Sequence, residues 1–294
     1  MVDNKIANWS HLKEVLRRHN FSFRKSLGQN FLIDKNILDK IVDAAGVSDD
    51  CAVLEIGAGA GVLTFQMGQA AKKVVTIEID RSLIPVLEEN LSGLDNITII
   101  ANDILKVDID ELFEEHFKNC KVKVVANLPY YITTPIIMKF LEGTAHVESL
   151  TVMVQKEVAQ RMCAKAGSKD YGALTVAVAY HTKASIVLEA SPHSFMPQPA
   201  VSSMVVNLEV LPNKSVCVNN EQLFFNIVKA AFGQRRKTLI NAISNSIQLD
   251  FEKTQIADVI EKMGLRPDVR GETLDVEQFA QLTNLLEGHN VYRQ

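Results

Sequence analysis

The heptapeptide NLPYYIT, residues 127–133, directly follows KVKVVA, a run typical of a buried strand. Its residue types can hold a flat amine. The side-chain carbonyl of Asn127 and the backbone carbonyl of Leu128 can each accept one amine hydrogen, and Pro129 restricts Leu128 to an extended shape. The ring of Tyr130 offers a surface for base stacking. We interpret the stretch as a clamp that frees the lone pair of a base amine for attack on an electrophile.

A plain turn at the end of a strand is the alternative for the same residues. Asn127 could then cap a helix that starts near Thr133 or Thr134, with the tyrosines packed inside. Phe195, in HSFMPQP, could stack on the other face of the base or pack in the interior. The residues alone leave both alternatives open.

A glycine-rich turn lies in EIGAGAGVLTF, residues 55–65, between an expected strand and an expected helix. Gly57, Gly59 and Gly61 allow the backbone to turn tightly and to approach a ligand without a Cβ in the way. This arrangement indicates a nucleotide-like ligand, although a purely structural turn remains possible. Val62 stands where a dinucleotide fold needs its third glycine, which disfavours NAD.

Two acidic residues follow the next two expected strands. Glu78, in TIEID, can accept both hydroxyl hydrogens of a ribose. Asp103, in NDILKV, can accept from an adenine amine, while Ile104 supplies an apolar contact to the ring. Because successive strands of an open parallel sheet end along one crevice, the glycine turn and both acids are expected to surround one ligand.

The elements that position these residues form an alternation of short β-branched runs and helical segments. This alternation predicts an α/β fold with a mostly parallel sheet and helices on both faces. VAVAYHTKASIVLEA, residues 176–190, and AVSSMVVNLEVL, residues 200–211, are expected to complete the sheet as strands. From Glu221 onward the periodicity is helical. We therefore expect a catalytic domain over residues 1–211, with a basic N-terminal extension over 1–33, and a helical domain over 212–294.

The composition is that of a globular protein. The chain has 294 residues, of which 47% are hydrophobic and 22% charged, with no run of the length that a membrane span needs. The N-terminus lacks the apolar core of a secretory signal, which predicts a cytoplasmic protein. The four cysteines are far apart and form no CxxC pair, so neither a zinc site nor a disulfide framework is expected.

The charge is distributed unevenly along the chain despite a formal net charge of −4. Residues 1–26 contain six Lys or Arg against two acids, and residues 226–237 carry four basic residues and no acid. Residues 103–115 are strongly acidic. Separate basic faces can attract a polyanion whatever the net charge. Solvated helix faces would also explain either basic cluster alone.

The order of these motifs resembles that of the class I S-adenosylmethionine (SAM) methyltransferases, in which Asn-x-Pro-Tyr marks enzymes that methylate base amines. The resemblance narrows to the KsgA/RsmA family and extends over nearly the whole chain. The segments that carry it are RKSLGQNFLID (24–34), VLEIGAGAGVLT (53–64), NLPYYITTPI (127–136), VQKEVAQRM (154–162), FMPQPAVSSMVV (195–206) and FGQRRKTLINAI (232–243).

The resemblance implies dimethylation of the N6 amines of two adjacent adenines near the 3′ end of 16S rRNA, within the immature small ribosomal subunit, by a monomeric enzyme. It implies SAM as the cofactor, S-adenosylhomocysteine as its product, and no metal. The cofactor contacts that it implies are Asn30, Leu32, Gly57, Glu78, Asp103 and Asn127, with Gly59 and Ile104 beside them. The candidate RNA contacts are Arg24, Lys25, Lys156, Arg161, Arg235, Arg236 and Lys237.

Three rival functions share these features. An enzyme of the macrolide-resistance type would dimethylate an adenine of 23S rRNA with the same fold, cofactor and clamp. A nonenzymatic nucleic-acid-binding factor could keep the fold, although Asn127 and Glu78 are both present here. Methylation of adenine in DNA is disfavoured because no separate sequence-reading domain is evident.

Overall fold

The computed structural model describes residues 9–118, 120–143 and 147–291. The chain forms two compact units. The first comprises Met1–Ala159 and Ser185–Val210, and the second comprises Gln160–Ala184 and Leu211–Gln294. This division differs from a single boundary at residue 211, because Gln160–Ala184 packs with the helical part of the chain.

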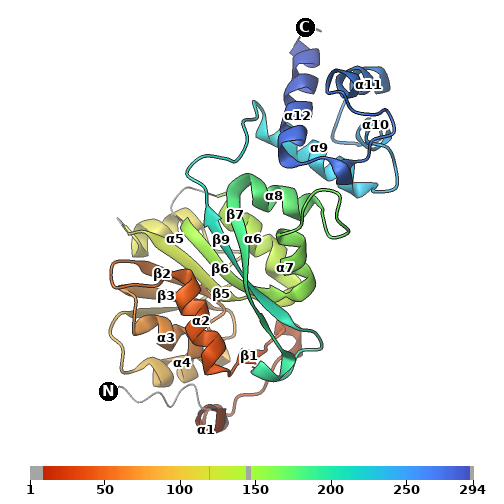
Figure 1. The fold of residues 1–294 in the computed structure, drawn as a ribbon. Helices are drawn as coiled ribbons and strands as arrows, with labels where there is room; N and C mark the ends of the chain where they lie inside the picture. The colour runs from red at the N-terminus through yellow and green to blue at the C-terminus, as the bar shows by residue number, and fades with distance from the viewer. Residues whose placement is uncertain (1–8, 119, 144–146, 292–294) are drawn as a thin grey trace. The chain divides into compact units, whose positions relative to one another are not determined.

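A seven-stranded sheet with the order β4-β3-β2-β5-β6-β9-β7 forms the centre of the first unit (Figure 1). The four neighbouring pairs from β4 to β6 are parallel, and β9 pairs with β6 in the antiparallel direction. The strands are β2 (Ala52–Ile56), β3 (Lys73–Glu78), β4 (Ile97–Ala101), β5 (Val122–Asn127), β6 (Val147–Gln155), β7 (Thr182–Ala190) and β9 (Ser203–Val210).

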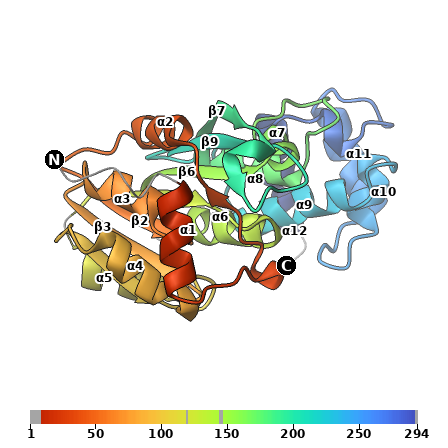
Figure 2. The same ribbon diagram turned by 90° about the horizontal axis from the view of Figure 1, so that it is seen from below.

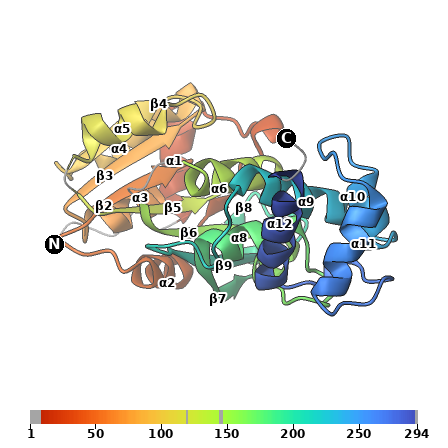
Figure 3. The ribbon, with the colours of Figure 1, turned by 90° about the horizontal axis from the view of Figure 1, so that it is seen from above.

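The central strands are apolar because both faces of the sheet are covered by helices. Every residue of β2 is buried, as expected for a central strand of a parallel sheet. Figures 2 and 3 show α2 (Lys35–Ala45) on one side of the sheet and α5 (Ile109–His116) with α6 (Thr133–Leu141) on the other. The predicted α/β architecture is confirmed.

The register of the parallel strands brings the predicted ligand-binding residues to one edge. Ile56 of β2 pairs with Ile77 of β3 and with Ala126 of β5. The glycine turn that follows β2 therefore lies at the same level as Glu78 and Asn127, the last residues of β3 and β5. Helices α3 (Val62–Gly68) and α4 (Ile84–Leu91) follow β2 and β3.

The N-terminal segment lies across this edge of the sheet. It contains α1 (Trp9–Arg18), a 3-10 turn η2 (Lys25–Leu27) and β1 (Phe31–Leu32), and β1 pairs with β8 (Phe195–Met196). Leu12, Val15 and Leu16 of α1 are buried in the same core as the helices beside the sheet. Figure 2 shows α1 nearest the viewer, across one end of the sheet.

The expected strand over residues 176–190 is wrong in its first part. Ala173–His181 forms the helix α8, and β7 begins only at Thr182. The run ALTVAVAYH is almost entirely apolar, so its periodicity does not distinguish a buried helix from a buried strand. Val176 and Tyr180 of α8 are buried in the core of the second unit, against the helices that follow residue 220.

The second unit is built from helices, as the periodicity predicts. They are α8, α9 (Glu221–Gly233), α10 (Leu239–Ser244), α11 (Lys253–Lys262) and α12 (Val276–Val291), and α7 (Lys156–Met162) ends within this unit. Gly264 ends α11 with a φ of 68°, and the side chain of Asp275 accepts from the backbone N–H of Gln278 at the start of α12. Gly271 is required for packing, since a Cβ there would lie 2.6 Å from the Cβ of Ala231.

Candidate active site

A pocket opens at the carboxyl ends of β2, β3 and β5. Its walls come from the glycine turn, the end of β3, the NLPY segment and residues 27–32 of the N-terminal segment. This is the place expected of a ligand site in an open parallel sheet. We call residues 24–30, which cross the pocket, the strap.

Most of the predicted site residues line this one pocket. They are Asn30, Leu32, Gly57, Gly59, Glu78, Asn127, Leu128, Pro129 and Tyr130. Asp103, Ile104 and Phe195 are described by the structure but do not contribute to its walls.

The glycine turn needs its glycines for two separate reasons. Gly57, Gly59 and Gly61 have φ values of 77°, 57° and 82°, which side chains with a Cβ rarely adopt. At Gly59 a Cβ would also lie 3.1 Å from the ring of Phe31 in β1. The backbone of the turn and the N-terminal segment therefore approach each other closely at the pocket.

Glu78 is held in place by backbone hydrogen bonds. One carboxylate oxygen accepts from the N–H of Gly59 at 2.8 Å, and the other accepts from the N–H of Asp80 at 2.8 Å. The residue is only 5% exposed, and this burial raises its pKa although the two hydrogen bonds oppose the shift. Each oxygen keeps a second lone pair, so the carboxylate can still accept from two hydroxyl groups.

The NLPY segment is held by hydrogen bonds at three of its residues. The side-chain Nδ2 of Asn127 donates to the backbone carbonyl of Asn30 at 2.9 Å, which leaves Oδ1 as the acceptor that the amide can offer to a ligand. Pro129 has φ −57° and ψ 130°, and the N–H of Leu128 donates to Met153. The hydroxyl of Tyr130 is bonded to Ser203 at 2.8 Å, and burial raises its pKa.

The alternative in which Asn127 caps a helix is not what the structure shows. Ile132 stands at the N-cap position of α6, and no side chain caps that helix. The Asn127 amide instead connects the end of β5 to the N-terminal segment, a contact between residues 97 positions apart in the chain.

Phe195 lies in the core and not in the pocket. It is 0% exposed and pairs with Leu32 between β8 and β1. The predicted stacking face is therefore covered where the ring now lies. The structure places Phe195 as a packing residue beneath the N-terminal segment.

Asp103 and Ile104 follow β4, one strand further from the pocket centre. A side-chain oxygen of Asp103 accepts from the N–H of Leu105 at 3.0 Å, and Ile104 is 5% exposed. Desolvation raises the pKa of Tyr131, and the charges of Asp103 and Glu78 raise it further. Both predicted carboxylates thus raise the pKa of the same tyrosine, although of the two only Glu78 lines the pocket.

Sequence reasoning missed several residues at this site. Gln29, Ile79 and Glu55 also line the pocket. Tyr131 is 56% exposed and approaches Gly28 of the strap, where a Cβ would lie 3.5 Å from its ring. The second tyrosine of NLPYYIT was the available signal for Tyr131, but nothing in the local sequence distinguishes Gln29.

Glu55 is a buried acid in β2 beside the pocket. One of its oxygens accepts from the hydroxyls of Thr64 and Thr76, and the residue is 1% exposed. Desolvation raises its pKa from 4.5 to about 7, against the two hydroxyl bonds and with some help from the charge of Glu78.

This pKa predicts that folding stability falls as the pH rises from about 4.5 to about 7. The unfolded chain loses the Glu55 proton first, so it binds fewer protons than the folded chain across this window. Glu55→Gln removes the effect, which is at most about 3 kcal/mol. Denaturant unfolding of both proteins at pH 5 and pH 8 measures it, and equal pH dependence of the two would contradict the assignment.

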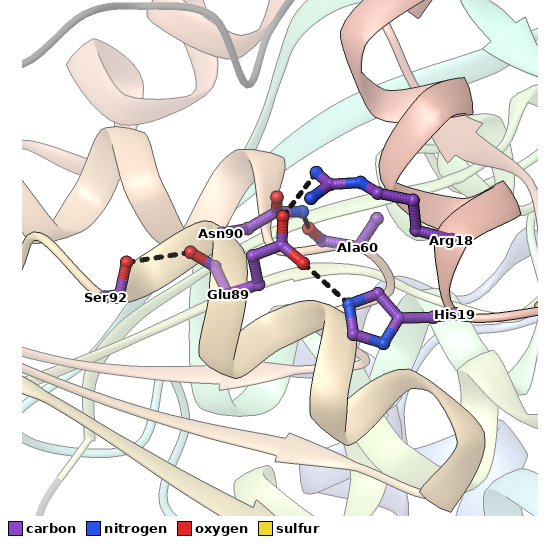
Figure 4. Close-up of polar contacts among 6 residues, drawn as sticks. All are labelled: Arg18, His19, Ala60, Glu89, Asn90 and Ser92. Carbon is purple, nitrogen blue, oxygen red and sulfur yellow. Dashed lines mark hydrogen bonds and ion pairs between the residues drawn. The ribbon is translucent and has the colours of Figure 1, made fainter.

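Helix α4 connects the N-terminal segment to the glycine turn, as Figure 4 shows. The carboxylate of Glu89 is paired with Arg18 and with His19 at the end of α1. The next residue, Asn90, is buried and donates to the carbonyl of Ala60 in the glycine turn at 2.8 Å. The hydrogen bond from His19, followed by the charge of Arg18, holds the pKa of Glu89 below its ordinary value.

The candidate RNA contacts occupy different settings. Arg24 lies 3.4 Å from Asp80, Lys156 is paired with Glu189, and Arg235 bonds the carbonyl of Lys169 and lies 3.3 Å from Glu272. The backbone carbonyl of Arg161 accepts from Thr175. The side chains of Arg161, Arg236 and Lys237 are exposed and have no partner of this kind among the described contacts. The side chain of Lys25 lies outside the described structure.

Within the described ranges, no group of three or more His, Cys, Asp or Glu side chains is placed to hold a metal ion. In the same residues, no helix has the length and apolar character that crossing a membrane requires.

Known proteins are similar to this chain over almost its whole length. Ribosomal RNA small subunit methyltransferase A of Clostridioides difficile (strain 630) is 50% identical over 283 residues, which cover 96% of this chain and 97% of that protein. The protein of the same name from Alkaliphilus oremlandii (strain OhILAs) is 49% identical over 283 residues, with coverage of 96% and 98%.

Solved structures show the same architecture. A dimethyladenosine transferase from Plasmodium falciparum superposes with a TM-score of 0.72 at 29% identity, over 87% of this chain and 96% of that one. The 23S rRNA methyltransferase ErmE gives a TM-score of 0.67 at 23% identity, over 88% and 100%, which bears on the fold alone. The fold is that of the class I SAM-dependent methyltransferases. Residues 20–286 match the model for ribosomal RNA adenine dimethylase, and the chain belongs to that family.

Proposed function

We propose that this protein transfers methyl groups from SAM to the N6 amines of two adjacent adenines near the 3′ end of 16S rRNA. The observation that carries the proposal is the Asn127 amide, fixed by its bond to Asn30 in a pocket that it shares with Glu78 and the glycine turn. The residues that we propose for base-amine recognition and for nucleotide recognition line the same pocket.

The residues of the clamp would make the adenine amine reactive without a charged base. Oδ1 of Asn127 and the carbonyl of Leu128 accept its two hydrogens and draw the nitrogen toward a pyramidal shape, which frees its lone pair. Tyr130 stacks on the extruded base. SAM, when bound, supplies the electrophilic methyl group. Methylation makes the amine acidic, so the proton can leave to water.

The cofactor would occupy the part of the pocket between the glycine turn and the strap. Glu78 accepts from the ribose hydroxyls, and Asn30 and Leu32 close the pocket from the N-terminal side. Gly57 and Gly59 allow close approach of the backbone. We keep Asp103 and Ile104 as proposed adenine contacts, which requires the segment after β4 to approach the bound ligand.

The choice of 16S rRNA is supported by the relatives. Those at 49–50% identity, which span nearly the full chain, are named for the small subunit. The 23S enzyme of similar fold is only 23% identical. An immature small subunit as the substrate, a cytoplasmic location and a monomeric enzyme complete the proposal.

Reverse-transcription mapping of rRNA from a deletion strain tests the choice of substrate. Loss of the two adjacent stops near the 3′ end of 16S rRNA is expected, with their return when the gene is restored. A loss confined to 23S rRNA would favour the macrolide-resistance type of enzyme instead.

The second unit carries a cluster of arginines. Arg236, Arg266 and Arg270 line one open cavity together with Thr238, Thr273 and Asp268, and Asp268 lies 3.3 Å from Arg266. Guanidinium groups bind phosphate through paired hydrogen bonds, and RNA helices are held mainly through their backbone and shape. We propose that this arginine cavity and the neighbouring Lys237 contact phosphates.

Replacing Arg236 and Arg270 by Ala is expected to weaken binding of small-subunit RNA at low salt. The slope of log affinity against log salt should become less steep by about one for each phosphate that the variant no longer binds. Filter binding at several salt concentrations measures both effects. Lys262→Ala, which removes an exposed charge from α11, is the control and should bind as the unchanged protein does. An unaltered slope in the arginine variant would contradict the assignment.

A further inference from the structure

The strap contributes Leu27, Gly28, Gln29 and Asn30 to the cofactor pocket, yet it has little regular structure of its own. Its path must therefore be fixed by bonds to the rest of the unit. One of these is the bond from Asn127 to the carbonyl of Asn30. Another runs through Asp80, which does not contribute to the pocket walls.

The carboxylate of Asp80 contacts both the turn that follows β3 and the strap. Oδ1 accepts from the N–H and the hydroxyl of Ser82, at 3.1 and 2.6 Å, and so caps the turn η3 (Arg81–Leu83). Oδ2 accepts from Nε2 of Gln29 at 2.8 Å, and the guanidinium of Arg24 lies 3.4 Å from Oδ1. The Asp80 side chain is fully buried. Arg24 and Gln29, near the two ends of the strap, therefore contact one carboxylate that is shielded from solvent.

Gln29 is fixed from both sides. Its Oε1 accepts from the backbone N–H of Arg24 at 2.8 Å, while its Nε2 donates to Asp80. A flip of the amide would therefore place two donors against each other at Arg24 and two acceptors against each other at Asp80. The orientation of the amide is therefore fixed. The Gln29 side chain links the strap both to the backbone of Arg24 and to Asp80.

Asp80 also acts on the opposite wall of the pocket. Its backbone N–H donates to Glu78 at 2.8 Å and orients the carboxylate that we assign to the ribose. We propose that Asp80 is a positioning residue for the cofactor, which holds the strap closed through Gln29 and aims Glu78 from behind. This inference rests on the proposed cofactor site.

A purely structural role would be limited to capping the turn at Ser82. The two roles separate in the variant Asp80→Asn, because an amide can keep the oxygen that faces Ser82. Its Nδ2 then faces Nε2 of Gln29, donor against donor. Gln29→Glu alone creates the opposite mismatch, carboxylate against carboxylate. In the double variant, which combines both substitutions, the introduced amide donates to the introduced carboxylate. The second oxygen of that carboxylate still accepts from the backbone N–H of Arg24, so both hydrogen bonds of residue 29 are restored, while the ion pair between Arg24 and Asp80 is not.

Calorimetric titration of the full chain with SAM tests the proposal. Each single variant is expected to bind at least about tenfold more weakly, since a hydrogen bond to a buried charge is lost. The double variant should return to within about threefold of the unchanged protein. Asp43→Asn, the same change at an exposed position of α2, is the control and should bind normally.

Limited digestion with trypsin provides a readout that does not depend on the cofactor. Cleavage after Arg24 and Lys25 should be faster in Asp80→Asn and should slow again in the double variant, while the melting temperatures show that each variant is folded. Normal SAM affinity of the single variants, or losses that merely add in the double variant, would overturn the role of Asp80. Failure of the unchanged protein to bind SAM would contradict the proposed function, and this inference with it.

Discussion

Asn127→Ala is expected to reduce methyl transfer to small-subunit RNA by about 100-fold or more. The variant loses Oδ1, the acceptor that we assign to the adenine amine, and the loss of one such group in an active site commonly has an effect of this order. It also loses the bond to Asn30. Because Asp80 and Gln29 still hold the strap, SAM affinity should change far less than the turnover rate.

The measurement is transfer of labelled methyl groups under single-turnover conditions, with SAM affinity determined separately. Asn207→Ala in β9 is the matched control, since it removes the same amide from the same sheet, where Asn207 accepts only from the Thr151 hydroxyl in the contacts described. It should retain near-normal transfer. A proportional loss of SAM affinity and transfer in Asn127→Ala would show that the residue holds the strap and not the amine.

Glu78→Ala is expected to weaken SAM binding by about 1.5 to 3 kcal/mol, or roughly 10- to 150-fold. The variant removes the proposed ribose acceptor, and it also leaves the N–H groups of Gly59 and Asp80 without their partner. Calorimetric titration gives the affinity directly. The effect should be largest for ligands that carry both ribose hydroxyls.

Two comparisons make the Glu78 result specific. Glu88→Ala removes the same charge from an exposed position on the neighbouring helix α4 and should bind SAM normally. With a 2′-deoxyribose analogue of the cofactor, the difference in affinity between the unchanged protein and Glu78→Ala should be smaller than the difference measured with SAM. If Glu78→Ala binds SAM as tightly as Glu88→Ala, the ribose assignment is wrong.

The sequence predicted the sheet and the pocket edge because both depend on local signals. A β-branched run followed by glycine, acid or asparagine marks the end of each strand, and parallel pairing then collects these ends in one place. The positions of Gly57, Glu78 and Asn127 follow from this rule, and the structure places all three at the pocket.

The features that the sequence did not predict depend on contacts between distant residues. The helix α8 was mistaken for a strand because an apolar run has no usable period. The burial of Phe195 follows from the pairing of β8 with β1, whose residues lie more than 150 positions apart. The bond from Gln29 to Asp80 spans 51 positions, and neither residue stands out in its own segment.

In the proposed mechanism, one pocket brings SAM and an adenine amine of 16S rRNA together at Asn127. The most direct measurement incubates the protein with SAM and immature small subunits and locates methylated nucleotides in the RNA by mass spectrometry. We predict two adjacent N6,N6-dimethyladenosines near the 3′ end of 16S rRNA, with neither formed by Asn127→Ala. Unmethylated 16S rRNA, or the same dimethyladenosines formed by Asn127→Ala, would contradict the account.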